Sequence, residues 1–147
     1  MTRDDFEYWL ADMDDALDRF LASIPASVAS HLDYSKPSLD VLEGWLLEKY
    51  TSHTSILRAS ESAFLDGASR YVGETFRHVL GGRRDIRLDD PKYVYYAMPQ
   101  LTDFAPKTTP VCPSALTTAA LNRRTGAYLS QTLTKMQQRY AGAKVGV

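Results

Sequence analysis

Hydrophobic residues recur at helical spacing in several long stretches of the chain. In the clearest stretch, residues 1–24, aromatic and aliphatic residues three or four positions apart form one apolar stripe, and the acidic residues lie largely off it. Thr2 followed three residues later by Asp5 is typical of a capping pair, and Pro25 marks the end of the stretch. The pattern predicts one acidic amphipathic helix over residues 1–24.

The same spacing predicts two helices within residues 38–80, the second beginning near residue 56 after a polar link. Each of them contains glycine, which lowers helix propensity by up to ~1 kcal/mol relative to alanine. We therefore expect close packing at Gly44, and close approach of another backbone at Gly67 and Gly73.

A β-hairpin is predicted over residues 84–101. The second of the two helices ends at the pair Gly81-Gly82, and residues 84–88 then form a first strand. The sequence Asp-Asp-Pro-Lys favours a turn, and residues 93–98 are rich in Tyr and Val, which favour strands. Two strands are marginally stable alone, so helices should cover them.

A last apolar stripe predicts a helix over residues 114–141, with residues 122–126 either helical or forming a bend. The resulting fold class is α+β and predominantly helical, with about four helices packed around one short antiparallel hairpin. The length fits a single domain over residues 1–147.

Composition excludes several kinds of site. One cysteine, Cys112, rules out an intramolecular disulfide framework and a cysteine-based metal cluster, and the three histidines are far apart in sequence. No nucleophile elbow or phosphate-binding loop is present, so we expect no metal, no cofactor and no assignable catalytic residue.

The apolar runs are shorter than the ~20 residues of a membrane span, and the acidic N-terminus is unlike a signal peptide. We expect a cytoplasmic protein without membrane contact.

The net charge of −1 conceals a strong asymmetry between the two halves of the chain. Residues 1–66 hold 13 Asp or Glu and 5 Lys or Arg, whereas residues 67–147 hold 5 and 12, so the balances are −8 and +7. Either the two halves neutralise each other across the fold, or one of them serves a charged partner.

Two surfaces are candidates for binding another protein. The first is the acidic side of the N-terminal helix, and the second is the hairpin, where arginines in the first strand face a tyrosine-rich second strand. The candidate partner-binding residues are Asp12, Asp15, Asp18, Arg84, Arg87, Tyr93 and Tyr95.

A small-ligand site is an alternative. The spacing of Arg70, Glu74 and Arg77 places the carboxylate between two guanidinium groups on one helix face, and Tyr71 lies beside them. Such a group could orient an anionic ligand, or it could be an ion-pair row on the helix surface. Arg123 and Arg124 of the last helix are further ligand-binding candidates.

Nucleic-acid binding is a third reading, because basic and aromatic residues together can bind phosphates and stack on bases. The isoelectric point near 6.3 and the lack of a recognisable nucleic-acid-binding motif argue against it.

Three segments carry a resemblance: LDYSKPSLDVLEGWL, YVGETFRHVLGGRRDIRLDDPKYVYYAMPQL and ALTTAALNRRTGAYLSQTL, within residues 32–134. The chain resembles small cytoplasmic bacterial proteins of uncharacterised function that pair a Tyr-x-Gly-Glu-x-x-Arg helix and a Gly-Gly stop with a following hairpin. Tyr71, Gly73, Glu74 and Arg77 are the matching positions, and no catalytic assignment comes with them. By size and type, such proteins resemble immunity or accessory proteins of bacterial conflict systems.

These observations favour a protein-binding domain without catalytic activity, most concretely an immunity protein that covers the active surface of a toxin. Its partner would be the toxin or a component of a secretion system. A ligand-binding or enzymatic domain using Glu74 and Arg77 is the alternative. The sequence leaves the oligomeric state open.

Overall fold

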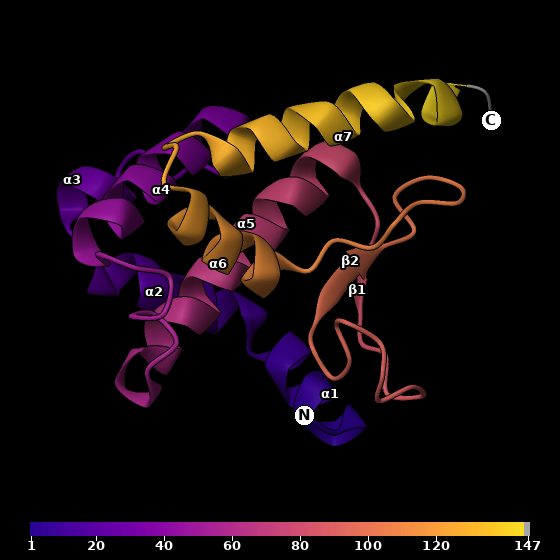
Figure 1. Cartoon of the computed structure of the whole chain (residues 1–147), viewed down its shortest axis with the longest axis horizontal. Coiled ribbons are helices and arrows are strands. Elements are labelled where there is room, and N and C mark those ends of the chain that lie inside the picture. The colour runs from indigo at the N-terminus through magenta and orange to yellow at the C-terminus, as the bar shows by residue number, and fades with distance from the viewer. Residues whose placement is uncertain (146–147) are drawn as a thin grey trace.

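The computed structural model describes residues 1–145, with side chains for residues 1–140. It is a mostly helical α+β structure with seven α-helices and one two-stranded antiparallel sheet (Figure 1). The elements in chain order are α1 (Arg3–Ala11), α2 (Met13–Ser23), α3 (Ala26–Ala29), α4 (Lys36–Lys49), the short 3₁₀ helix η1 (Ala59–Glu61), α5 (Ser62–Leu80), β1 (Arg83–Asp85), β2 (Gln100–Thr102), α6 (Pro113–Arg123) and α7 (Tyr128–Val145).

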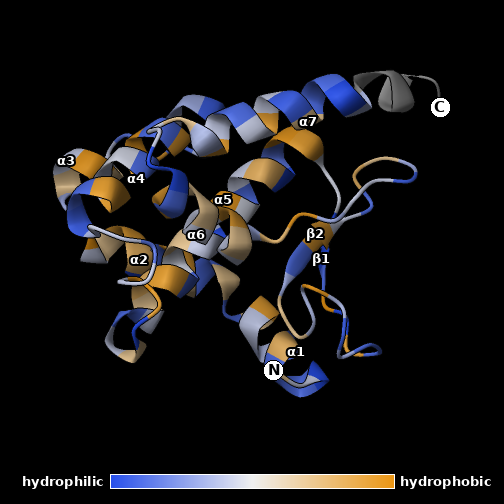
Figure 2. Cartoon of the chain, in the orientation of Figure 1, coloured by the Kyte–Doolittle hydropathy of each residue, from blue (hydrophilic) through white to orange (hydrophobic). Residues whose placement is uncertain are grey.

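Helix α5 lies at the centre of the molecule. Helices α2, α4 and α6 pack against it, α7 crosses above, and the sheet lies at one end (Figure 1). The helices α2 and α5 carry both hydrophobic and hydrophilic bands, which suits helices with one buried side (Figure 2). The core that they enclose includes fully buried residues from four helices: Leu39, Leu42, Leu46, Tyr71, Phe76, Leu121, Leu129 and Leu133.

The predicted N-terminal helix is divided at Asp12, which ends α1 and precedes α2. In an uninterrupted helix the carbonyl of Trp9 would accept from the amide of Met13. Here that carbonyl accepts from Nη1 of Arg70 in α5, at 2.8 Å. The prediction of one continuous helix was therefore wrong, because a side chain 61 positions away takes part in the hydrogen bonding at the division.

The predicted capping pair at the start of α1 is confirmed. The hydroxyl of Thr2 accepts from the amide of Asp5, and the carboxylate of Asp5 accepts from the amide of Thr2. These hydrogen bonds hold the pKa of Asp5 below its ordinary value.

The sheet differs from the predicted hairpin in both strands. The first strand, expected over residues 84–88, covers only Arg83–Asp85. Residues 93–98 form turns, and β2 begins only after Pro99. The register pairs Arg83 with Thr102 and Asp85 with Gln100. The tyrosine-rich segment has strand propensity, but local bonds such as Tyr96 N to the Tyr93 carbonyl fold it into turns instead.

The expectation of about four helices was too low. The segment 26–37, which had no predicted element, contains α3, and the helix expected from residue 56 begins with turns and η1 before α5 starts at Ser62. The bend considered for residues 122–126 is present, because Arg124 takes a left-handed conformation and separates α6 from α7. None of the helices within residues 1–145 combines the length and the apolar character needed to cross a bilayer.

The helical glycines differ in what surrounds them. A Cβ at Gly67 would overlap the ring of Phe20, and one at Gly73 would lie 3.0 Å from Cγ of Pro113. The close neighbours are therefore side chains, where we expected backbone. Gly44 has nothing within 4 Å of its Cβ position, so the expectation of close packing there was wrong.

Alanine substitutions at two of these glycines should have opposite effects. Gly67→Ala should lower the free energy of unfolding by about 1–3 kcal/mol, because the buried Phe20 ring must move. Gly44→Ala, in open space on α4, should raise it by up to about 1 kcal/mol through helix propensity. Urea denaturation of both variants measures this, and an equal effect of the two would contradict the packing at Gly67.

Candidate functional site

Glu74 of α5 lies among three basic side chains. Its carboxylate forms ion pairs with Arg84 of β1 and with Arg77, whose Nη1 lies 3.3 Å from Oε1, and Nε2 of His78 lies 3.1 Å from the same oxygen. The side chains of Glu74 and Arg84 are only 14% and 17% exposed. This cluster joins the start of the sheet to the central helix.

Arg70 does not belong to that cluster, contrary to the expected row Arg70, Glu74, Arg77. Its side chain is 4% exposed and turns toward α1, where Nε donates to Asp66 at 2.8 Å and the guanidinium lies 4.4 Å from the centre of the Trp9 ring. Trp9 in turn donates from Nε1 to Asp66 at 2.9 Å. The three residues connect α1 to α5.

Tyr71 is fully buried in the core. Its hydroxyl lies 2.7 Å from Oγ of Ser38 and accepts from the amide of Tyr34 at 2.9 Å, and the rings of Tyr34 and Tyr71 are stacked. This placement gives Tyr71 a structural role at the start of α4. Its proposed contact with a ligand would require the core to open.

The basic residues of the sheet region are mostly paired with carboxylates. Arg83 contacts Asp85 and Asp103, and Arg87 contacts Asp89 while lying 4.4 Å from the centre of the Tyr93 ring. Arg84 faces Glu74, and burial together with the nearby charge of Arg70 lowers its pKa.

Tyr93 and Tyr95 are half-buried in the turns between the strands. The hydroxyl of Tyr93 donates to Oε1 of Gln100 at 2.8 Å, and the two tyrosine rings meet edge to face. Burial raises the pKa of Tyr95 above its ordinary value. These contacts account for both tyrosines within the fold.

Arg123 and Arg124, at the end of α6, have different surroundings. Arg123 is exposed and lies over the ring of Tyr128 at 5.3 Å. Arg124 donates to the carbonyls of Leu47 and Tyr50, at 2.9 and 3.0 Å, near the end of α4. Arg124 therefore satisfies carbonyls that a helix end leaves without partners.

The acidic side of the N-terminal segment is exposed. We call it the acidic face and define it as five exposed carboxylates of α1 and α2 that form no ion pair or hydrogen bond with another described residue: Asp4, Glu7, Asp14, Asp15 and Asp18. The candidate Asp12 differs from these, because Arg19 binds it with two hydrogen bonds that hold its pKa below the ordinary value.

Tyr8 of α1 lies next to Glu7 of the acidic face and was not among the candidates predicted from the sequence. It is 79% exposed, with Asp4 and Asp12 four positions away on either side. In the periodic pattern Tyr8 lies outside the apolar stripe. An aromatic residue at a position that the pattern assigns to solvent could have identified it.

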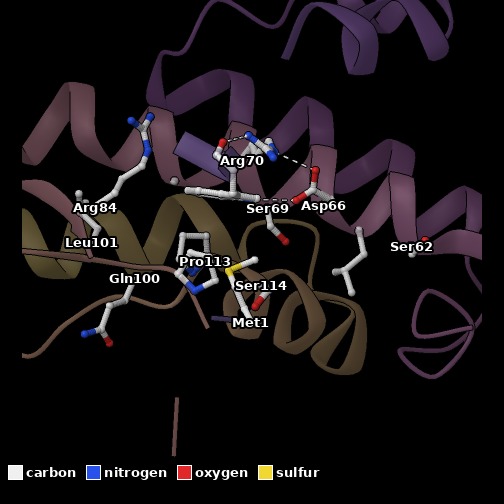
Figure 3. A pocket seen from close by; sticks show the side chains of 14 residues that line it. Met1, Ser62, Asp66, Ser69, Arg70, Arg84, Gln100, Leu101, Pro113 and Ser114 are labelled. Carbon is white, nitrogen blue, oxygen red and sulfur yellow. Dashed lines mark hydrogen bonds and ion pairs between the residues drawn. The ribbon is translucent and has the colours of Figure 1, made fainter. Parts of the chain in front are cut away.

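A cavity of about 230 Å³ opens between α1, α5, β2 and α6 (Figure 3). Its wall is mainly apolar and includes Trp9, Leu65, Pro99, Leu101 and Pro113. Arg70, Arg84 and Ser69 also line it, whereas Glu74 does not. The sequence could not indicate this cavity, because its wall comes from five elements, α1, α5, β1, β2 and α6, which are spread over residues 1–114.

In the described part of the chain no three His, Cys, Asp or Glu side chains gather closely enough to hold a metal ion. Cys112 is buried, with Sγ 3.6 Å from Oγ of Ser114. At Glu74, one ion pair joins α5 to Arg84 of β1, and the contacts with Arg77 and His78 lie within α5. No protein-family model, no curated protein and no solved structure matches this chain.

Proposed function

We propose that this chain is a non-enzymatic protein-binding domain whose acidic face docks on a basic partner. The observation that carries the proposal is Tyr8 of α1, which is 79% exposed and lies next to Glu7 and one helical turn from Asp4, two carboxylates of the acidic face. Large exposed aromatic residues are enriched among the residues that dominate binding at protein interfaces. A partner with a basic surface would neutralise the surrounding carboxylates.

The distribution of ion pairs supports this proposal. Among the described residues only two ion pairs join the acidic half of the chain to the basic half, Arg3 with Asp85 and Arg70 with Asp66. The other pairs lie within one half. Direct pairing across the fold therefore leaves the carboxylates of the acidic face available to a partner.

The partner class that fits best is a basic enzyme that acts on nucleic acid, as in an immunity protein that neutralises a bacterial toxin in the cytoplasm. Exposed carboxylates can occupy a groove that otherwise binds phosphates. The nucleic-acid alternative has less support, because carboxylates already pair with Arg83, Arg84 and Arg87. The ligand alternative at Glu74 loses support because that carboxylate is enclosed by basic side chains outside the cavity.

The test is a pull-down with the full chain from a lysate of its native cells, followed by binding kinetics with any protein retained in stoichiometric amount. We expect a basic protein whose association slows as salt is added. The double variant Asp15→Lys and Asp18→Lys should slow association about tenfold at low salt, since it reverses charge in the docking surface. Tyr8→Ala should cost about 2 kcal/mol of binding free energy through faster dissociation.

Glu48→Lys is the matched control for Asp18→Lys. Glu48 is exposed on α4 and is not part of the acidic face, and its reversal changes the net charge by the same amount. If the acidic face is the docking surface, Asp18→Lys should slow association strongly and Glu48→Lys should slow it little. Equal effects of the two substitutions would mean that only net charge matters. The docking surface would be contradicted if the Tyr8 variant and the Asp15/Asp18 variant both bound the partner with wild-type affinity.

A further inference from the structure

The buried hydroxyl of Ser69 distinguishes the cavity from an ordinary packing defect. Ser69 is 7% exposed, and its Oγ has no hydrogen-bond partner among the described residues. Leaving a buried hydroxyl unsatisfied is unfavourable. Figure 3 shows this hydroxyl directed from α5 toward the side of the cavity formed by Ser114 and Met1.

Other serine and threonine hydroxyls in the helices avoid this cost by local bonding. Thr75, Thr117, Thr118 and Thr132 each donate to the carbonyl four residues earlier in the chain. Such bonds are the usual solution for a hydroxyl within a helix. Ser69 makes no such bond, so its hydroxyl remains able to donate to, or accept from, a molecule in the cavity.

The charges at the cavity are already paired. Arg70 forms its ion pair with Asp66, and Arg84 forms its ion pair with Glu74. An ionised ligand would lose its hydration on entering a mainly apolar space. The two guanidinium groups there would not compensate this loss fully, because each already faces a carboxylate. An uncharged ligand avoids this desolvation cost.

The volume limits the size of the ligand. The cavity measures about 230 Å³, and an engineered apolar cavity of about 150 Å³ in another protein holds benzene. The space therefore admits one substituted ring of similar size. The half-exposed Met1 side chain lies at the edge of the cavity, where a flexible thioether can adjust to an entering molecule.

From these observations we infer that the cavity between α1, α5, β2 and α6 is a binding site for a small uncharged molecule. The ligand has an apolar ring and one hydroxyl group, and that hydroxyl bonds Ser69. This inference does not depend on the proposed docking of the acidic face, which uses exposed side chains of α1 and α2.

The two tryptophans provide the readout. Trp9 lines the cavity, whereas Trp45 of α4 packs against Phe64 and does not line it. Proton–nitrogen NMR spectra resolve the indole N–H of each. Titration with 4-methylphenol should shift the Trp9 signal in a saturable manner and leave the Trp45 signal in place, and unsaturable or equal shifts of both would overturn the inference.

Three probes that share a methyl-substituted benzene ring test the chemistry. Toluene lacks the hydroxyl of 4-methylphenol, and 4-methylbenzoate replaces it with a charge. We expect 4-methylphenol to bind up to about tenfold more tightly than toluene, as one neutral hydrogen bond allows. Tighter binding of 4-methylbenzoate than of 4-methylphenol would overturn the assignment of an uncharged ligand.

Two variants test the location. Ser69→Ala should retain toluene binding and remove the preference for 4-methylphenol, so an unchanged ratio of the two affinities would overturn the role of Ser69. Ser114→Leu should abolish binding of both probes by filling the space beside that hydroxyl. An unchanged NMR spectrum away from the cavity checks that each variant is folded, and persistent binding to folded Ser114→Leu would place the probe elsewhere.

Discussion

Replacing Glu43 by alanine should destabilise the fold by about 3–5 kcal/mol, the largest effect that we expect from a single substitution. Glu43 of α4 is completely buried, and its two carboxylate oxygens accept from the backbone amides of Tyr128 and Leu129, at 3.0 and 2.9 Å. These are the first amides of α7, which have no partner within their own helix. The carboxylate thus caps α7 from another helix.

The expected magnitude follows from what the substitution removes. A hydrogen bond to a charged group contributes about 1.5–3 kcal/mol, and the side chain also fills space in the core. The residue before α7 is Ala127, which cannot supply a capping side chain of its own. A loss of this size is a large part of the roughly 5–15 kcal/mol that stabilises a typical domain.

Thermal and urea unfolding measure this effect. We expect the midpoint temperature of Glu43→Ala to fall by about 10 °C or more. Glu43→Gln keeps the shape but presents an amide N–H to one backbone N–H, so its loss should be smaller yet substantial. Glu48→Ala, an exposed site on the same helix, should change stability by less than about 0.5 kcal/mol. Equal stabilities of the Glu43 and Glu48 variants would contradict the capping role.

Replacing Arg70 by alanine should cost about 3 kcal/mol and release α1 from α5. The buried guanidinium donates to the carbonyl of Trp9 and to Asp66, and it packs on the indole ring. Without it, the Trp9 carbonyl loses a charge-assisted bond and the ring loses its cationic neighbour. Arg70→Lys should recover only part of this, because one ammonium group lacks the fork geometry of the guanidinium.

Hydrogen exchange of the α1 amides distinguishes local release from general destabilisation. We expect these amides to lose protection in Arg70→Ala more than the amides of α4 and α7 do. Arg77→Ala is the control on the same helix, because its side chain is 44% exposed and its ion pair with Glu74 should contribute less than about 1 kcal/mol. Unchanged protection of α1 in Arg70→Ala would contradict this connection.

The burial of Glu43 and the ion-pair partner of Arg70 could not be predicted from the sequence. Glu43 is a charged residue within an amphipathic stretch, and its burial depends on α7, 85 positions later in the chain. Arg70 has acidic neighbours at helical spacing on both sides, Asp66 and Glu74, and local spacing alone does not choose between them. The indole of Trp9 settles the choice, because Asp66 bonds both it and Arg70.

The sequence by itself determined the helical α+β class, the apolar stripes, the capping pair at Thr2 and the helix stop at Gly81, because periodicity, caps and glycine conformation act within a few residues. Only the tertiary structure decided the division at Asp12, the strand that pairs with β1, the partner of each guanidinium, and the cavity beside Ser69. Each of these depends on contacts between segments distant in the chain, and such contacts override local propensity where buried polar groups must find partners.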